Sequence, residues 1–234
     1  MSNKKAPKKK LSEGTQALII CLSAVALIVI ALVAVLVVST QDNSPKPVNM
    51  VAVQAEINSK STYDFDETTE VTEYVRLTVK DKGDIVIRLR SDIAPLTVQN
   101  FQTLVKNGFY DGLIFHRVIK NFMIQGGSGE TAGKSATAIK GEFTANGVNN
   151  TLKHIRGVIS MARVPGQNNS ASSQFFICDA TSPSLDGEYA TFGYVVAGMG
   201  VVDAIASVPV TGDANSPRPI TDVVIEKAVF VTPN

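Results

Sequence analysis

The sequence predicts a mainly β domain, a closed antiparallel barrel with two helices, preceded by one transmembrane helix. Three observations support this prediction. Short apolar runs separated by turn residues extend through residues 73–232, and only two stretches there have helical spacing. Strands and helices do not alternate, which argues against a parallel α/β sheet. A separate run near the N-terminus, residues 17–38, is apolar except for one serine.

The average composition combines two unlike parts. The 234 residues include 22 Lys and Arg and 21 Asp and Glu, a net charge of +1 that gives no support to a nucleic-acid binder. Residues 1–16 alone carry five Lys and one Glu, which leaves 17 basic (22 − 5) and 20 acidic (21 − 1) residues in the remainder. The near-neutral total is therefore a basic tip cancelling a mildly acidic remainder.

The apolar run from Ala17 to Val38 is long enough to cross a membrane. A helix of this length measures about 33 Å, against a hydrocarbon core of roughly 30 Å. The lysines before it place the N-terminus in the cytoplasm by the positive-inside rule, with the rest of the chain outside the plasma membrane. A cleaved signal peptide is the alternative, but its apolar region would be shorter, about 7–15 residues. Residues 39–72, polar and with an acidic cluster, are expected to form a flexible linker.

The elements of the domain follow in order from Glu73. Apolar residues alternate on both sides of the turn at residues 81–84, which predicts a β-hairpin. Pro95 opens a helix that Asn107-Gly108 ends. Further strands are expected at 113–119, 122–125, 157–162, 174–178, 192–196 and 220–231, with a second helix at 201–207.

The glycine-rich stretch 126–135 invites a nucleotide-binding interpretation, which its spacing does not support. A Walker A loop ending at Ser135 needs glycine where Ser128 stands. Gly127 and Gly129 fit a loose dinucleotide fingerprint, but no amphipathic helix follows them. Since hydrolase motifs and metal-ligand spacing of histidine or cysteine are also missing from the sequence, no metal and no cofactor are expected.

One face of the predicted strands combines polar and aromatic side chains. Arg117 lies in an otherwise apolar strand, where a guanidinium is costly to bury unless its hydrogen bonds are accepted. Alternation places Met123 with Gln125, and Gln174 with Phe176. This pattern alone favours a structural ion pair for Arg117 and half-exposed amides, and leaves a binding groove open as the alternative.

Four motifs occur in order along the domain: Phe115-His116-Arg117-Val118-Ile119-x-x-Phe122-Met123-Ile124-Gln125-Gly126-Gly127, Gly157-Val158-Ile159-Ser160-Met161-Ala162, Ser173-Gln174-Phe175-Phe176-Ile177 and Leu185-Asp186-Gly187-x-x-x-x-Phe192-Gly193. Through them the chain resembles the cyclophilin-type peptidyl-prolyl cis-trans isomerases. The resemblance implies an eight-stranded antiparallel barrel capped by two helices, and a monomer without a cofactor. The expected topology resembles that of bacterial envelope foldases, which act on exported or surface proteins.

The resemblance also assigns site residues. It makes Arg117 the catalytic arginine, assisted by Phe122, Gln125 and Phe176. Substrate would further contact Met123, Ala162, Arg163, Gln174, Leu185 and Tyr189, where Phe122, Met123, Phe176 and Leu185 form the proline pocket and the two glutamines hold the peptide backbone.

Three positions depart from the family's common pattern. Arg163 stands where Asn is common, Tyr189 where a pocket histidine is frequent, and Ser184 where a Trp is often found. The last change counts against binding of cyclosporin.

Expected partners are proline-containing peptides, unfolded exported proteins, and membrane lipid around residues 17–38. The alternative function is a non-catalytic proline-peptide-binding chaperone or holdase, which the presence of Arg117, Phe122 and Gln125 disfavours.

Overall fold

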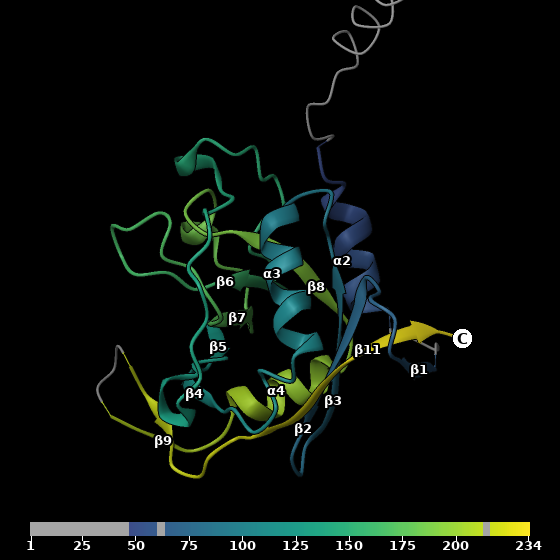
Figure 1. Ribbon diagram of the computed structural model, residues 1–234, viewed down its shortest axis with the longest axis vertical. Helices are drawn as coiled ribbons and strands as arrows, with labels where there is room; N and C mark the ends of the chain where they lie inside the picture. The colour runs from purple at the N-terminus through teal and green to yellow at the C-terminus, as the bar shows by residue number, and fades with distance from the viewer. Residues whose placement is uncertain (1–46, 60–63, 213–215) are drawn as a thin grey trace, which may run out of the picture. The chain divides into compact units, whose positions relative to one another are not determined.

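The computed structural model describes residues 47–59, 64–212 and 216–234 (Figure 1). The predicted basic tip, the transmembrane segment 17–38 and the first residues of the linker lie outside them. No helix in the described part of the chain is long and apolar enough to cross a bilayer. The helices are α2 (Met50–Asn58), α3 (Pro95–Lys106) and α4 (Met199–Ala206), with short 3₁₀ turns at Glu130–Ala132, Thr144–Asn146 and Pro183–Leu185. The strands are β1 (Phe65–Thr68), β2 (Tyr74–Val79), β3 (Gly83–Leu89), β4 (Phe115–Ile119), β5 (Met123–Gly126), β6 (Val158–Met161), β7 (Phe175–Cys178), β8 (Thr191–Ala197), β9 (Val210–Thr211), β10 (Arg218–Pro219) and β11 (Ile225–Pro233).

Nine strands form one antiparallel sheet in the order β1-β11-β2-β3-β8-β6-β7-β5-β4, and β9 pairs with β10 separately. The mainly β prediction is confirmed, but the closed eight-stranded barrel is wrong. Strand β1 adds to the outer edge of β11, and the terminal strands β1 and β4 do not pair. Before β4 the chain meets the start of β11 through one isolated bridge, between Ile114 and Val224, with backbone hydrogen bonds around it, but β4 and β11 themselves form no ladder.

The first hairpin follows from its sequence. Strand β2 alternates half-buried and buried residues, with Val75, Leu77 and Val79 inside, and pairs residue by residue with β3. The turn between them reverses the chain at Asp81 and Gly83, which have φ angles of 59° and 105°. Glycine adopts this left-handed region readily, which allows the tight turn. The pairing of β2 with β3 confirms the hairpin predicted at residues 75–89.

Helix α3 begins at Pro95 as predicted, but a distant residue satisfies its N-terminus. The preceding Ala94 offers no side-chain cap. Glu142 instead accepts hydrogen bonds from the backbone N–H of Leu96 at 3.1 Å and of Thr97 at 2.7 Å. A carboxylate at this end of a helix also stabilises the helix dipole. This buried contact ties the loop after β5 to α3.

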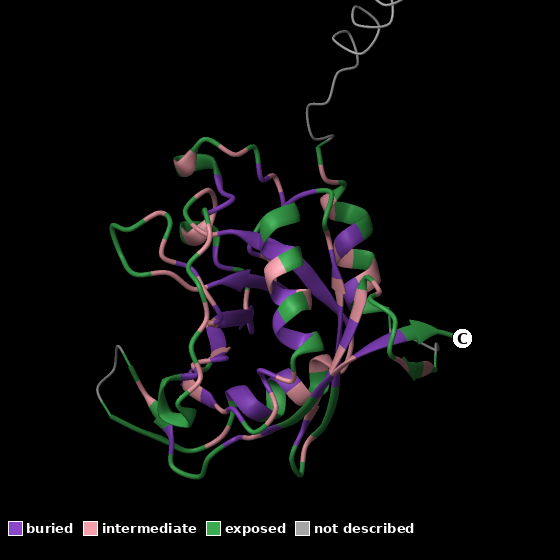
Figure 2. Ribbon diagram, in the orientation of Figure 1, coloured by how far each residue is buried: buried purple, intermediate pink, exposed green. Residues whose placement is uncertain are grey.

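The main core lies between the sheet and two of the helices. Phe101 and Val98 of α3 belong to the same buried cluster as Val202 and Ile205 of α4. Helix α4 contacts β3, β4 and β5, whereas α3 contacts β11. Figure 2 shows strands β6, β7 and β8 buried almost throughout their length. The sheet is therefore a rigid support for any side chain on its outer face.

Helix α2 and strand β1 lie within residues 39–72, the stretch expected to be a flexible linker, and they correct that expectation. Val53 and Ile57 of α2 are buried against the domain, and α2 contacts β8. Its Glu56 accepts a hydrogen bond from the Tyr194 hydroxyl at 2.8 Å. Gly157, with a φ of 90°, leaves room for the helix, because an added Cβ would lie 2.8 Å from Ile57. A nine-residue helix is stable here through these tertiary contacts.

We predict that the substitution Val53→Ala lowers the free energy of unfolding of the full chain by about 1–3 kcal/mol, because it leaves a cavity under α2. Each kcal/mol should lower the melting temperature of a domain of this size by roughly 2–4 °C. Val51→Ala in the same helix is the matched control, since Val51 is 79% exposed and Val53 only 3%. Equal melting temperatures for the two variants, measured by near-ultraviolet circular dichroism, would show that α2 does not support the domain.

Candidate active site

Two neighbouring strands, and the residue just before a third, place the polar side chains of the predicted site in one row. Arg117 on β4 lies opposite Gln125 on β5, and β5 pairs in turn with β7. Arg117 Nη1 donates to Gln125 Oε1 at 3.1 Å, and Gln125 Nε2 donates to Gln174 Oε1 at 3.0 Å. The guanidinium also lies 3.8 Å from the sulfur of Met123. Hydrogen bonds along the row hold the arginine in one position on the sheet surface.

An apolar cavity of about 270 Å³ adjoins this row. Nine of the ten predicted site residues line it together with Pro165, and the tenth, Gln174, is joined to it through Gln125. Met123 and Phe176 are the buried floor, at 2% and 5% exposure. The lining residues that the sequence predicted are Arg117, Phe122, Met123, Gln125, Ala162, Arg163, Phe176, Leu185 and Tyr189.

Cys178 lies beneath the floor of the cavity, in one cluster with Met123 and Phe176. Burial raises the pKa of this thiol to about 12, and the nearby carboxylate of Asp186 adds to the effect. At neutral pH the group is therefore an uncharged, apolar part of the floor and not a nucleophile.

A buried hydrogen-bonded group supports Phe176 from behind, and sequence reasoning missed it. The ring of His154 stacks on Phe176 with centroids 5.9 Å apart and an angle of 13°. Its Nδ1 lies 3.0 Å from Asp186 Oδ1 and its Nε2 lies 3.1 Å from Ser160 Oγ. Ser160 is fully buried, so the three residues serve as a support and not as a nucleophilic triad. Asp186, in the Leu-Asp-Gly motif, and Ser160, in the motif at residues 157–162, are the members of this group that lie in motifs of the sequence.

Electrostatics keep His154 neutral. Burial lowers its pKa below the ordinary value of 6.5, although the hydrogen bond that its Nδ1 donates to the Asp186 carboxylate opposes this shift. The neutral ring has one donor and one acceptor, which match a carboxylate on one side and a hydroxyl on the other. Phe176 thus presents an apolar ring to the cavity, and the hydrogen-bonded polar groups lie behind that ring.

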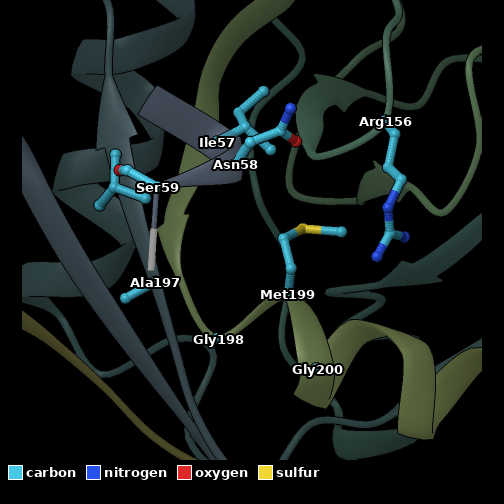
Figure 3. Close-up of a pocket in the computed structure, with 9 residues that line it drawn as sticks. Ile57, Asn58, Ser59, Arg156, Ala197, Gly198, Met199 and Gly200 are labelled. Atoms are coloured by element: carbon cyan, nitrogen blue, oxygen red, sulfur yellow. The ribbon is translucent and has the colours of Figure 1, made fainter. Parts of the chain in front are cut away.

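A larger cavity, of about 430 Å³, lies between the end of α2 and the start of α4 (Figure 3). Arg156 is the one charged side chain among the nine residues that line it. That guanidinium pairs with Asp203 at 2.8 Å and with Asp179 at 3.5 Å. Size alone does not identify a site, and this cavity has no group of converging polar side chains. The smaller cavity beside Arg117 is therefore the candidate active site.

Comparison with known proteins identifies the family of the chain. The sequence profile of the family described as cyclophilin type peptidyl-prolyl cis-trans isomerase/CLD matches residues 74–230. The chain belongs to this family. It is 43% identical over 148 residues to the peptidyl-prolyl cis-trans isomerase ppi1 of Schizosaccharomyces pombe, covering 63% of this chain and 92% of that one.

Two further relatives extend the comparison. A peptidyl-prolyl cis-trans isomerase of Acinetobacter baylyi is 50% identical over 135 residues, covering 54% of this chain and 69% of the relative. The crystal structure of a cyclophilin from Cryptosporidium parvum, determined in the presence of the dipeptide Ala-Pro, superimposes with a TM-score of 0.59 at 32% identity. That likeness covers 67% of this chain and 98% of the other. This chain is thus a cyclophilin-type peptidyl-prolyl cis-trans isomerase.

We predict that acid destabilises the fold through His154. Its pKa is lowered in the folded chain, so the unfolded chain binds the proton first as the pH falls. The stability contributed by the neutral ring is complete above about pH 6.5 and is lost below it. In thermal unfolding between about pH 7 and pH 5, His154→Asn should reduce the slope of melting temperature against pH.

His116 provides the comparison, because burial and the charges of Arg218 and Arg117 lower its pKa too. His116→Asn should remove a separate part of the slope, and the double variant should remove both parts. A slope that His154→Asn leaves unchanged would contradict the assignment.

Proposed function

We propose that Arg117 accelerates rotation about the X-Pro bond by donating a hydrogen bond to the prolyl nitrogen. Rotation breaks amide resonance against a barrier of about 18–20 kcal/mol and needs no proton transfer or nucleophile. As resonance is lost the nitrogen gains a lone pair, which can accept a hydrogen bond that the planar amide does not accept well. A donor placed there stabilises the twisted state more than the planar one.

The apolar cavity supplies the second part of the proposed mechanism. Its floor of Met123 and Phe176 offers a surface on which the proline ring can be held without hydrogen-bonding groups. Gln125, which holds the guanidinium, and Gln174, which is hydrogen-bonded to Gln125, are suited to hold the peptide backbone. Fixing the ring while the preceding carbonyl rotates restricts the bound peptide to the twisted geometry. The Ala-Pro dipeptide used with the Cryptosporidium parvum cyclophilin is a ligand of this chemical type.

The observation that carries the proposal is the position of the Arg117 guanidinium, half-buried at the cavity wall and held by Gln125. One charge-assisted hydrogen bond is worth about 1.5–3 kcal/mol, or roughly a tenfold to hundredfold change in rate. The remaining acceleration is assigned to the cavity and the glutamine row.

The proposed setting is the outer side of the plasma membrane. Residues 17–38 would anchor the chain in the lipid, with the lysine-rich N-terminus in the cytoplasm, as in a bacterial-like membrane-anchored cyclophilin. The substrates would then be exported or surface proteins that fold outside the membrane. The sequence pattern of residues 1–38 supports this part of the proposal.

We predict that Arg117→Ala lowers kcat/KM for isomerisation of an Ala-Pro peptide by at least about tenfold, because the donor to the twisted amide is lost. The melting temperature should change little, since the guanidinium lies on the sheet surface and not in the core. Rates come from two-dimensional exchange spectroscopy on the peptide. Arg76→Ala, which removes an ion-paired arginine from β2, away from the cavity, serves as the control. Full activity in Arg117→Ala would refute its role, and peptide binding without faster exchange in the wild type would favour a holdase.

We predict that protease added to intact cells removes the domain but leaves residues 1–16 protected. Loss of detectable domain within minutes is expected for an outward orientation, and a cytoplasmic protein in the same cells monitors lysis. Complete protection of the domain until the cells are lysed would contradict the proposed topology.

A further inference from the structure

Arg163 lines the candidate active site, but its hydrogen bonds run to the protein itself. It follows β6, and its side chain is only 8% exposed. Its Nε donates to the backbone oxygen of Glu188 at 2.9 Å, and its Nη2 donates to the Glu188 carboxylate at 3.1 Å. Both contacts reach the segment that follows the Leu-Asp-Gly motif.

Two aromatic rings enclose the guanidinium of Arg163. Its Cζ lies 5.1 Å from the ring centroid of Phe143 and 4.9 Å from that of Tyr189. Phe143 is buried, so this planar cation fills the space between a core ring and a ring of the cavity wall. Cation–π contacts are strongest where water is excluded, as it is here.

Tyr189 connects Arg163 to the floor of the cavity. Its ring meets Phe176 edge-on, with centroids 5.7 Å apart and an angle of 86°. The backbone N–H of Ala145 donates to Gly187 O at 2.8 Å, which joins the segment after Phe143 to the segment before Tyr189. Arg163 thus lies at the meeting point of three segments that are distant in the sequence.

We propose that Arg163 is a positioning residue that holds Tyr189 against Phe176 and so keeps the cavity at the width of a five-membered ring. This role rests on the proposed proline-isomerase site. Arg163 acts through Tyr189 and does not donate to the peptide, because its Nε and Nη2 donors are directed to Glu188 and its Nη1 is directed to the backbone oxygen of Val164 at 3.4 Å. Without the guanidinium between the two rings, Tyr189 has space to tilt away and the cavity widens.

The test compares two peptides with the full chain, one containing proline and one containing pipecolic acid, its six-membered homologue. Arg163→Ala should lower kcat/KM for the proline peptide by roughly fivefold to thirtyfold, with a fall in kcat as well as a rise in KM. The preference for proline over pipecolic acid should fall at the same time. Arg163→Lys keeps the charge but loses the planar group between the two rings and the paired N–H donors to Glu188. It should therefore show most of the same loss.

Glu188→Gln separates positioning from direct contact with the peptide. It weakens the hold on Arg163 while leaving that side chain in place, so it should reduce the proline preference in the same direction and less strongly. Glu188→Gln combined with Arg163→Ala should do little more than Arg163→Ala alone. Arg90→Ala is the matched control, since Arg90 is partly buried, pairs with Asp92 at 2.7 Å and does not line the cavity.

The outcomes are distinguishable. An unchanged proline preference in Arg163→Ala, or a rise in KM alone, would overturn the positioning role and indicate a direct donor to the peptide. If Arg163→Ala does not fold, Arg163→Lys and Glu188→Gln decide the question. The quantity compared is again the ratio of kcat/KM for the proline peptide to kcat/KM for the pipecolic acid peptide. A wild-type chain without isomerase activity would overturn the proposed function, whereas normal wild-type activity with an unchanged ratio would overturn only the role of Arg163.

Discussion

The hydrogen-bonded row from Arg117 through Gln125 to Gln174 is the interaction on which the rest of the site depends. A guanidinium beside an apolar cavity loses hydration, and its position is stable only where acceptors replace the water. The antiparallel register of β4, β5 and β7 supplies Gln125 as an acceptor directly opposite Arg117. The same alternation turns Ile124 and Ile177 into the core, so the strands that carry the row cannot shift without exposing buried side chains.

Long-range carboxylates hold the surroundings of this row in place. Glu142 satisfies the N-terminus of α3, Glu56 joins α2 to β8, and Asp186 orients the imidazole behind Phe176. Each contact links segments that are at least 32 residues apart. These contacts form when the chain folds and do not involve a peptide. The cavity therefore exists before a peptide binds. A preformed cavity reduces the ordering that binding would otherwise require.

The sequence predicted those elements whose signals are local. Alternating apolar residues gave the β2–β3 hairpin, and Pro95 with Asn107-Gly108 gave α3. Helix α2 was missed because Val53 and Ile57 become a buried face only through contact with β8, in a stretch otherwise typical of a linker. Strand β1 was missed because Asp66 and Glu67 have low strand propensity, and its pairing with β11 joins opposite ends of the domain.

The site itself was only partly predictable from pattern. Period-two alternation placed Met123 with Gln125 on one face, but by itself favoured an ordinary ion pair for Arg117. The cavity also needs Ala162, which follows β6, and Leu185 and Tyr189 from the connection between β7 and β8, and only the resemblance to a family indicated them. Pro165, at the rim, and the support formed by His154, Ser160 and Asp186 have no regular spacing that a sequence pattern could detect.

A crystal structure of the domain with a bound Ala-Pro peptide is the decisive measurement of how Arg117 acts. We expect the proline ring to occupy the cavity of about 270 Å³ over Phe176, with an Arg117 nitrogen within about 3.5 Å of the prolyl nitrogen. Electron density for the peptide in the cavity between α2 and α4, or a proline ring in place with Arg117 directed elsewhere, would contradict it.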